Sequence, residues 1–386
     1  MHKLHDVSTV KRKKMSDIFS VSNLGPILNA EVEFGDLTIL TGPQATGKTL
    51  FLESFALFCN SKYIAYDFLE SNGISSDTKT FLDYYYGENM HNIIQTNTVF
   101  NFLNRIYSPN NLSTEISENI KMWMQQKYPL NFDVVLPNAY YIPAQRSLAI
   151  SEGRIKTSDD FINSPYSLVK FCKFLQDYVK KNQTELLKDK IKDFEFFKAS
   201  KINMKRNAGS PRLEMTVDNQ TVPYMAWSTG QRELAPLLMS IEYFEKYTPK
   251  SYIIIEEPEL GLHPRAIIEF MLTVLQIMQT GTKVIISTHS STPLDFVWTI
   301  KHLKENGAKT SELSKMFDFK IKDKSVFDNI FEKTFKTYYF APDKKTKKVT
   351  TKDISSLDVY SEDEEIASWG GMSLSADRAG SIVSKF

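Results

Sequence analysis

The chain has 386 residues, of which 42% are hydrophobic and 24% are charged. This length and composition are sufficient for a large hydrophobic core, which excludes a disordered tail and a disulfide-stapled miniprotein. The 47 lysines and arginines nearly balance the 46 aspartates and glutamates, so the formal net charge is +1. That balance excludes a uniformly basic nucleic-acid binder and a strongly acidic protein, and leaves room only for local charged patches.

The cysteines and the hydropathy pattern indicate the compartment. Cys59 and Cys172 are the only cysteines, and they lie far apart outside any Cys-x-x-Cys pattern. This usage is typical of a reducing compartment and argues against a structural zinc site. No apolar run reaches the roughly 18 residues of a membrane span, and the basic residues 11–14 precede no signal-peptide core. We therefore expect a cytoplasmic protein with no membrane partner.

The first elements form a hairpin followed by a strand, a loop and a helix. Extended chain over residues 18–32 is interrupted by the turn-forming sequence 23–26, which predicts the hairpin. The β-branched run at 37–41 predicts a strand, and the apolar stretch 50–58 predicts a helix. The residues between them contain two glycines and are predicted to form a loop.

The middle of the chain has a mixed pattern. Residues 61–133 combine apolar residues at mixed spacing with many Asn, Tyr and Ser, and we interpret them as a helical insertion with loops. Strand character returns at 139–143, and apolar residues recur at helical spacing over 167–197. Residues 202–204 and 213–217 predict a second hairpin.

Two further apolar runs, 252–255 and 284–287, predict buried strands on either side of a helix at 265–279. Short apolar strands that alternate with helices are typical of a parallel sheet covered on both faces. We therefore predict an α/β fold. Beyond residue 300 the pattern weakens, and only 337–340 predicts another strand, which we expect to be the last.

The loop after the strand at 37–41 has the sequence Gly42-Pro43-Gln44-Ala45-Thr46-Gly47-Lys48-Thr49, which fits G-x-x-x-x-G-K-[ST]. Backbone N–H groups of such a loop approach an anion closely, and the following helix N-terminus adds positive potential. In this arrangement the lysine contacts the β- and γ-phosphates, and the Thr49 hydroxyl ligates Mg²⁺. A tight turn with a surface lysine is the alternative, but the strand–loop–helix context favours a nucleoside triphosphate site.

Acidic residues follow the strand at 252–255. Ligands of open α/β sheets gather at the carboxyl ends of the strands, so these acids are candidates for chemistry. We assign Glu256 to magnesium binding through water and Glu257 to polarising the attacking water, because phosphoryl transfer depends on positioning and charge compensation. The alternative is an acidic cluster that favours a helix start through the macrodipole.

Two more segments carry candidate residues. Ser228, Thr229, Gly230 and Gln231 precede an apolar stretch and suit a helix N-terminus that receives a phosphate, although a plain helix cap has the same composition. His289 follows the strand at 284–287, where an imidazole can donate to a γ-phosphate oxygen and sense hydrolysis. A lone histidine is more often structural, which is the alternative here.

The order of these motifs resembles the ABC-class ATPases of the SMC, RecF and OLD type. The resemblance rests on the phosphate loop, Tyr141-Ile142-Pro143-Ala144-Gln145-Arg146, Ser-Thr-Gly-Gln-Arg-Glu from 228, Glu-Glu-Pro-Glu-Leu-Gly-Leu-His-Pro from 256, Ser-Thr-His-Ser from 287 and the turn at 23–26. It implies an ABC-type ATPase head with a mostly parallel core sheet flanked by helices, an antiparallel β-subdomain and a compact helical insertion.

The resemblance also implies how the site works. ATP and Mg²⁺ would bind at a composite site in a homodimer or higher homo-oligomer, where residues 228–231 of one chain close over the nucleotide on Lys48 of another. Gln145 would be the coupling glutamine, which contacts nucleotide and metal, and His289 would be the switch. Glu256 departs from the pattern, because many ABC proteins carry Asp there.

The lengths of the segments between the motifs indicate which kind of ABC-class ATPase the chain resembles. Residues 50–227 are too few for the long coiled-coil arm of SMC proteins, so a compact arm is expected. Residues 301–386 lack the Asp-x-Asp pair of the Toprim domain in OLD nucleases, so we do not expect nuclease activity in this chain. The compact form resembles the ATPase subunits of the antiphage systems PARIS and Septu. That resemblance implies a sensor and regulator of an effector nuclease encoded nearby, with DNA or a phage protein as trigger.

Two other interpretations stay open. The first is an SMC-like ATPase of DNA repair or chromosome maintenance, in which the lysine-rich stretch 180–206 lines a DNA groove. The second is a scaffold that binds ATP and seldom hydrolyses it.

The predicted organisation has seven segments. They are a basic tail (1–15), a core lobe with the phosphate loop (16–60), the helical insertion (61–133), a core strand with the glutamine segment (134–147), a helical arm (148–200), a second core segment (201–300) and a C-terminal accessory region (301–386).

Overall fold

The computed structural model describes residues 17–72, 77–103, 105–108, 137–161, 163–182, 185–187, 194, 197, 200–205, 211–247, 252–317, 321 and 324–384. The predicted basic tail, residues 109–133 of the predicted insertion and much of the lysine-rich stretch 180–206 lie outside this part of the chain.

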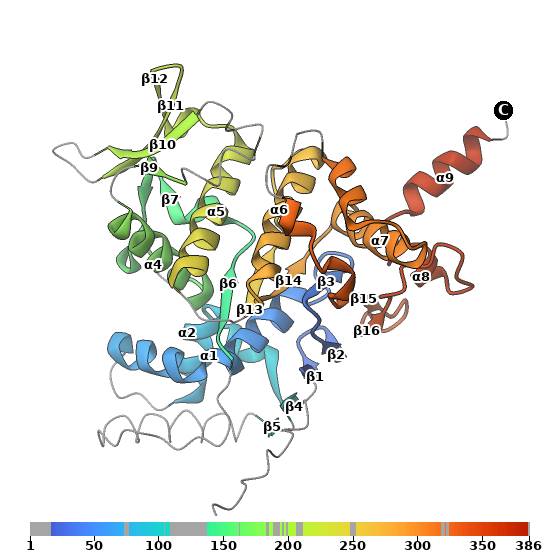
Figure 1. The fold of residues 1–386 in the computed structure, drawn as a ribbon. Helices are drawn as coiled ribbons and strands as arrows, with labels where there is room; N and C mark the ends of the chain where they lie inside the picture. The colour runs from blue at the N-terminus through green and yellow to red at the C-terminus, as the bar shows by residue number, and fades with distance from the viewer. Residues whose placement is uncertain are drawn as a thin grey trace, which may run out of the picture.

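A ten-stranded sheet forms the centre of the described fold (Figure 1), in the order β5-β4-β1-β2-β16-β15-β3-β14-β13-β6. Its last five strands are parallel to one another. They are β15 (Phe335–Pro342), β3 (Leu37–Thr41), β14 (Lys283–Ser287), β13 (Tyr252–Glu256) and β6 (Ala139–Ile142). Every residue of β3 and β13 is buried, as expected for strands covered on both faces. The predicted α/β fold with a mostly parallel core sheet is confirmed.

The other side of the sheet is mainly antiparallel. It contains β1 (Ile18–Leu24), β2 (Ile27–Glu33), β4 (Ile94–Phe102), β5 (Arg105–Tyr107) and β16 (Val349–Asp353). β1 and β2 form the predicted hairpin, and β4 pairs with β1. β4 and β5 lie in a segment for which we expected helices. Burial in β4 repeats every second residue, which is the period of a strand and not of a helix. Thr98, Phe100 and Phe102 are buried and alternate with exposed residues.

The C-terminal region is built into the core, which corrects the expectation of an accessory region with one final strand. β15 lies parallel to β3 near the centre of the sheet, and β16 follows it antiparallel. Phe340 of β15 packs edge-on against Phe51, with ring centroids 5.5 Å apart. Part of the segment 301–386 therefore supports the strand that leads into the phosphate loop.

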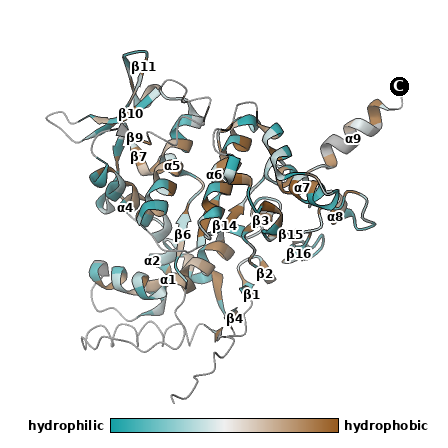
Figure 2. Ribbon diagram, in the orientation of Figure 1, coloured by the Kyte–Doolittle hydropathy of each residue, from teal (hydrophilic) through white to brown (hydrophobic). Residues whose placement is uncertain are grey.

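Helices cover both faces of the sheet. α1 (Lys48–Asn72) and α2 (Thr78–Tyr86) lie on one face, and α5 (Thr229–Tyr247), α6 (Pro264–Gln279) and α7 (Thr292–Glu305) lie on the other. Two hydrophobic clusters lie on opposite faces of the sheet, and successive side chains of β3 belong to one and then the other. Leu40 packs in the cluster on the α1 side, and Ile39 packs in the cluster on the side of α5 to α7. Figure 2 shows hydrophobic residues concentrated where helices and sheet meet. α1 runs well past the predicted helix 50–58, into the expected insertion.

A smaller sheet lies beyond α5 (Figure 1), in the order β12-β11-β10-β9. Its strands are β9 (Glu185–Leu186), β10 (Ser200–Lys205), β11 (Arg212–Val217) and β12 (Gln220–Pro223). β10 and β11 form the second predicted hairpin. The expected helical arm contains α4 (Tyr166–Lys181), but also the short hairpin of β7 (Ile150–Ser151) and β8 (Arg154–Ile155).

The remaining elements are short. 3₁₀ turns span Met90–Ile93, Arg146–Ala149, Ser158–Asp160, Tyr224–Ala226, Thr310–Met316, Lys324–Phe327 and Ile330–Glu332. The chain continues after β16 with α8 (Glu364–Ala367) and α9 (Leu374–Val383), and α9 projects from the body of the molecule (Figure 1). Of the helices in the described ranges, none combines the length and the apolar character that crossing a membrane requires.

Candidate nucleotide-binding site

The phosphate loop connects β3 to α1, and its two glycines are required by close packing. Gly42 has φ +143° and Gly47 has φ +87°. A Cβ at Gly42 would lie 2.8 Å from the carbonyl oxygen of Phe340, and one at Gly47 would lie 2.8 Å from Cγ1 of Ile27. β15 and β2 thus pack closely against the two glycines of the loop. Pro43, Gln44 and Ala45, which lie between the glycines, are exposed. The loop therefore turns tightly and starts α1 at Lys48.

Lys48 lies folded over this loop and is only 6% exposed. Its Nζ donates to the carbonyl oxygens of Gly42 (2.8 Å) and Pro43 (2.9 Å), and it lies 3.4 Å from Oγ1 of Thr46. Burial lowers the pKa of Lys48 to about 8, and the nearby acids after β13 oppose that shift. The ammonium group is therefore held against the carbonyls of the loop, and its predicted contact with phosphates stays a prediction.

Thr49 and Glu256 connect the first turn of α1 to the end of β13. Thr49 Oγ1 donates to Glu256 Oε1 at 2.6 Å, and the carboxyl group is buried. Burial raises the pKa of Glu256, while the bond from Thr49 lowers it. Hydroxyl and carboxylate oxygens are the hard ligands that Mg²⁺ prefers, so this pair fits the predicted metal. Within the described residues there is no cluster of three His, Cys, Asp or Glu side chains that could hold a metal. Mg²⁺ sites that bind phosphates usually rely on one or two protein carboxylates.

Glu257 and His289 lie next to that pair. His289 Nε2 is 3.5 Å from Glu257 Oε1, and both side chains are partly exposed. The hydrogen bond and charge of His289 lower the pKa of Glu257, which keeps this carboxylate ionised near neutral pH. Glu257 itself has φ +40°, and its N–H donates to the carbonyl of Ser287. An ionised, accessible carboxylate with a fixed backbone suits the predicted task of polarising water.

A third acid, Glu259, was not assigned by the sequence analysis. Its Oε1 accepts from the backbone N–H of His289 (2.6 Å) and from Thr288 Oγ1 (2.9 Å). Glu259 therefore fixes the backbone from which the imidazole extends. The sequence contained a signal for this role, because Glu259 and His289 each follow the end of adjacent parallel strands.

Arg146 is the buried centre of the region, and sequence reasoning missed it. The side chain is fully buried, and its Nε donates to the carbonyl of Glu233 at 3.1 Å. Its two terminal nitrogens donate to the carbonyls of Glu256 (2.9 Å) and Glu257 (3.2 Å). Ser147 adds a hydrogen bond from its backbone N–H to the Glu233 carboxylate. Arg146 therefore connects α5, the end of β13 and the segment after β6.

Residues 228–231 begin α5 as a capping box. Gln231 N–H donates to Ser228 Oγ at 3.2 Å, and Ser228 N–H donates to Gln231 Oε1 at 3.0 Å. Thr229 is exposed, Gly230 is buried, and the loop after β13 packs on them, because a Cβ at Gly261 would lie 3.0 Å from Cγ2 of Thr229. The plain cap is thus formed, and the phosphate-binding role of this segment stays a prediction.

Gln145 immediately precedes the 3₁₀ turn Arg146–Ala149, and its side chain is exposed. It follows β6, which lies beside β13 in the sheet. This position is compatible with the predicted contact to nucleotide and metal, which stays a prediction.

One segment of the chain is similar to a known protein family. Residues 103–292 match the family model of the AAA ATPase domain. The match includes β6, α5, β13, β14 and His289, and the phosphate loop precedes it. Together with the phosphate loop, this similarity supports an ATPase. No curated protein matches the chain.

Two solved structures are similar at low identity. The SMC head domain from Thermotoga maritima is 8% identical, with a TM-score of 0.39 over 88% of this chain and 98% of that one. An SmcHead bound to the C-winged helix domain of ScpA is 9% identical, with a TM-score of 0.41 over 88% and 97%.

Proposed function

We propose that the protein binds ATP with Mg²⁺ on residues 42–49 and hydrolyses it. The hydrogen bond between Thr49 and Glu256 is the observation that carries this proposal, because it brings the end of the phosphate loop and the first acid of β13 into one site. Glu257 lies beside it with a lowered pKa, so its carboxylate is ionised near neutral pH, and His289 Nε2 is 3.5 Å from that carboxylate.

Each residue has a separate task in this proposal. Lys48 binds the β- and γ-phosphates, for which it must leave the carbonyls of Gly42 and Pro43. Thr49 and Glu256 hold Mg²⁺, which would neutralise charge on the phosphates. Glu257 orients the attacking water and accepts its proton, and the imidazole of His289 lies close enough to respond to the γ-phosphate.

Hydrolysis is tested with two site variants and two surface controls. Lys48→Ala removes phosphate binding, so we expect loss of both ATP binding and turnover. Glu257→Gln keeps the shape of the site without its base, so ATP should bind while turnover falls by a factor of about 100 or more. Lys309→Ala and Glu305→Gln, at exposed positions, should behave as wild type. Wild-type turnover equal to that of Lys48→Ala would refute hydrolysis, and retained ATP would then favour the scaffold.

We also propose that two chains close around the nucleotide, with residues 228–231 of one chain facing Lys48 of the other. Support comes from the exposure of Ser228 and Thr229 at the start of the 19-residue helix α5, where backbone N–H groups and the macrodipole favour a phosphate. Ser228→Arg should block ATP-dependent assembly of the Glu257→Gln protein, measured by light scattering. Unchanged assembly would contradict a composite site.

The biological role rests on the resemblance alone. We propose that ATP-dependent closure controls a separate effector, a nuclease in an antiphage system, and an SMC-like role in DNA repair is the alternative. Co-purification of a nuclease encoded beside this chain would favour defence. Salt-dependent duplex binding without any such partner would favour repair.

A further inference from the structure

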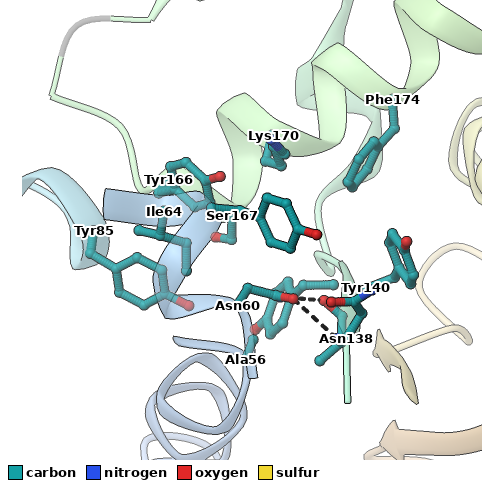
Figure 3. A pocket seen from close by; sticks show the side chains of 13 residues that line it. Ala56, Asn60, Ile64, Tyr85, Asn138, Tyr140, Tyr166, Ser167, Lys170 and Phe174 are labelled. Carbon is teal, nitrogen blue, oxygen red and sulfur yellow. Dashed lines mark hydrogen bonds between the residues drawn. The ribbon is translucent and has the colours of Figure 1, made fainter. Parts of the chain in front are cut away.

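A cavity of about 310 Å³ lies between α1, α4 and β6, away from the phosphate loop (Figure 3). Six aromatic side chains from four elements line it: Tyr63, Tyr85, Tyr140, Tyr141, Tyr166 and Phe174. Its volume lies at the lower end of the range of small-molecule sites, about 300–1,000 Å³. Aromatic walls of this kind bind flat rings by stacking.

The floor of the cavity is fixed by an unusual pairing of α1 with the edge of the sheet. The side-chain amide of Asn60 donates to the carbonyl of Ala139 and accepts from its N–H at 3.2 Å. These are the two hydrogen bonds that a further strand would make with β6, so the amide closes this part of the edge (Figure 3). The cavity is therefore a preformed space and not an open strand edge.

The cavity shares Tyr166 and Lys170 with a neighbouring groove, also of about 310 Å³, that has a different chemistry. Three lysines and three acids line the groove: Lys170, Lys173, Lys180, Asp67, Glu70 and Asp177. Lys170 is paired with Asp67 at 2.7 Å. Because these charges balance, the groove favours polar, uncharged groups such as sugar hydroxyls over a phosphate.

We propose that this double cavity binds an uncharged nucleoside, with the base between the tyrosine rings and the sugar in the charged groove. The ring cavity supplies stacking surfaces and the groove supplies donors and acceptors for hydroxyl groups. Tyr166 and Lys170 line both spaces, which therefore lie side by side along α4, and the proposed ligand would extend past these two side chains from one space into the other.

The cavity is connected to the nucleotide site through Glu53, which lies one helical turn after Thr49 on α1. Ser167, in the cavity wall, donates to Glu53 Oε1 at 2.8 Å, and the hydroxyl of Tyr85 donates to the Glu53 carbonyl at 2.7 Å. The ring of Tyr141 lines the cavity, while its buried hydroxyl interacts electrostatically with Glu256. A bound nucleoside would thus touch Ser167 and Tyr141, which interact with the carboxyl groups of Glu53 and Glu256. This link rests on the proposed function, whereas nucleoside binding does not.

The test is calorimetric titration of the full chain with adenosine, guanosine, cytidine and uridine. Tyr63 is 58% exposed at the rim, so Tyr63→Ala should leave the fold intact and weaken binding by at least about fivefold. Tyr360→Ala is the control, because Tyr360 is also an exposed tyrosine but lines neither the cavity nor the groove. We expect Tyr360→Ala and Lys48→Ala to bind nucleosides as wild type does, and adenosine monophosphate to bind more weakly than adenosine.

Several outcomes would overturn the proposal. They are no binding of any of the four nucleosides at millimolar concentration, equal loss in Tyr63→Ala and Tyr360→Ala, or full affinity in Ala56→Leu, which fills the cavity from α1. Loss of nucleoside binding in Lys48→Ala would place the ligand at the phosphate loop and would also refute it. A chain that binds adenosine in this pattern without hydrolysing ATP would contradict only the proposed function.

Discussion

Thr49 Oγ1 and Glu256 Oε1 lie 2.6 Å apart, although 207 positions separate the two residues in the chain. The parallel pairing of β3, β14 and β13 produces this contact, because it aligns the carboxyl ends of the strands. Many proteins of the family that the sequence resembles carry an aspartate at this position. The longer side chain of Glu256 still accepts a hydrogen bond from the threonine hydroxyl. The extra methylene therefore does not prevent the contact between the two side chains.

This contact predicts a specific effect on metal binding. Thr49→Val keeps the volume of the side chain but removes its hydroxyl, so the Mg²⁺ concentration for half-maximal ATPase activity should rise about tenfold or more. Thr49→Ser retains the hydroxyl and should stay within about threefold of wild type. Activity is measured as phosphate release across a magnesium titration. If both variants needed the same Mg²⁺ concentration for half-maximal activity, Thr49 would not be a ligand of the metal.

Lys48 predicts a pH dependence of ATP affinity. Because burial lowers the pKa of Lys48 to about 8, its ammonium group loses the proton as pH rises through that value. ATP affinity should therefore fall between pH 7 and pH 9 in the wild type, by up to about tenfold per pH unit above the pKa. Lys48→Arg keeps its charge over this range, so whatever its absolute affinity, its pH profile should be flat. Fluorescent-nucleotide titrations measure both profiles, and parallel profiles would contradict the role of Lys48 charge.

Arg146 predicts a large loss of stability. Arg146→Met removes the guanidinium donors from the carbonyls of Glu256 and Glu257, of which the latter keeps the N–H of Leu260. It also takes from the buried Glu233 carboxylate the cation that lies 3.7 Å away. The free energy of unfolding should fall by about 3 kcal/mol or more, because a buried charge loses its partner. Arg212→Met is the control, since both side chains of the Arg212 pair with Glu152 are exposed and the pair contributes little. Urea unfolding compares the two, and similar losses would show that Arg146 is not a structural centre.

The sequence predicted those parts of the site that depend on local chain geometry. Gly42 to Thr49 and the strand that ends at Glu256 carry their own signals, because a strand–loop–helix pattern and a buried apolar run are local features. Arg146 carried no such signal, since its partners lie on α5 and β13, and nothing in the residue type reveals which distant carbonyls it meets. The same limit explains Glu53, whose burial depends on α2 and α4.

The sheet shows the same division. β3, β13 and β14 were predicted with nearly the observed bounds, since each is a short apolar run. β15 was recognised as a strand, but its place beside β3 was not, because pairing of parallel strands depends on the whole sheet and not on neighbouring residues. β4 was missed because its exposed Gln, Thr and Asn residues made the alternation weak.

Glu53 predicts a pH dependence of stability with a sign opposite to that of most carboxyl groups. Burial, together with the charge of Glu256, raises its pKa to about 8, so the folded chain holds a proton there that the unfolded chain releases near its ordinary value. Folding therefore binds a proton between about pH 4.5 and pH 8, and the contribution of Glu53 to stability should fall as pH rises through this window. Glu53→Gln cannot ionise and can still accept from Ser167, so its stability should decline less over the same range. Chemical unfolding at pH 5, 6.5 and 8 measures the difference between the two proteins. If the free energy of unfolding changed with pH equally in the wild type and in Glu53→Gln, Glu53 would be ionised in the folded chain. Its carboxyl group would then be accessible to solvent.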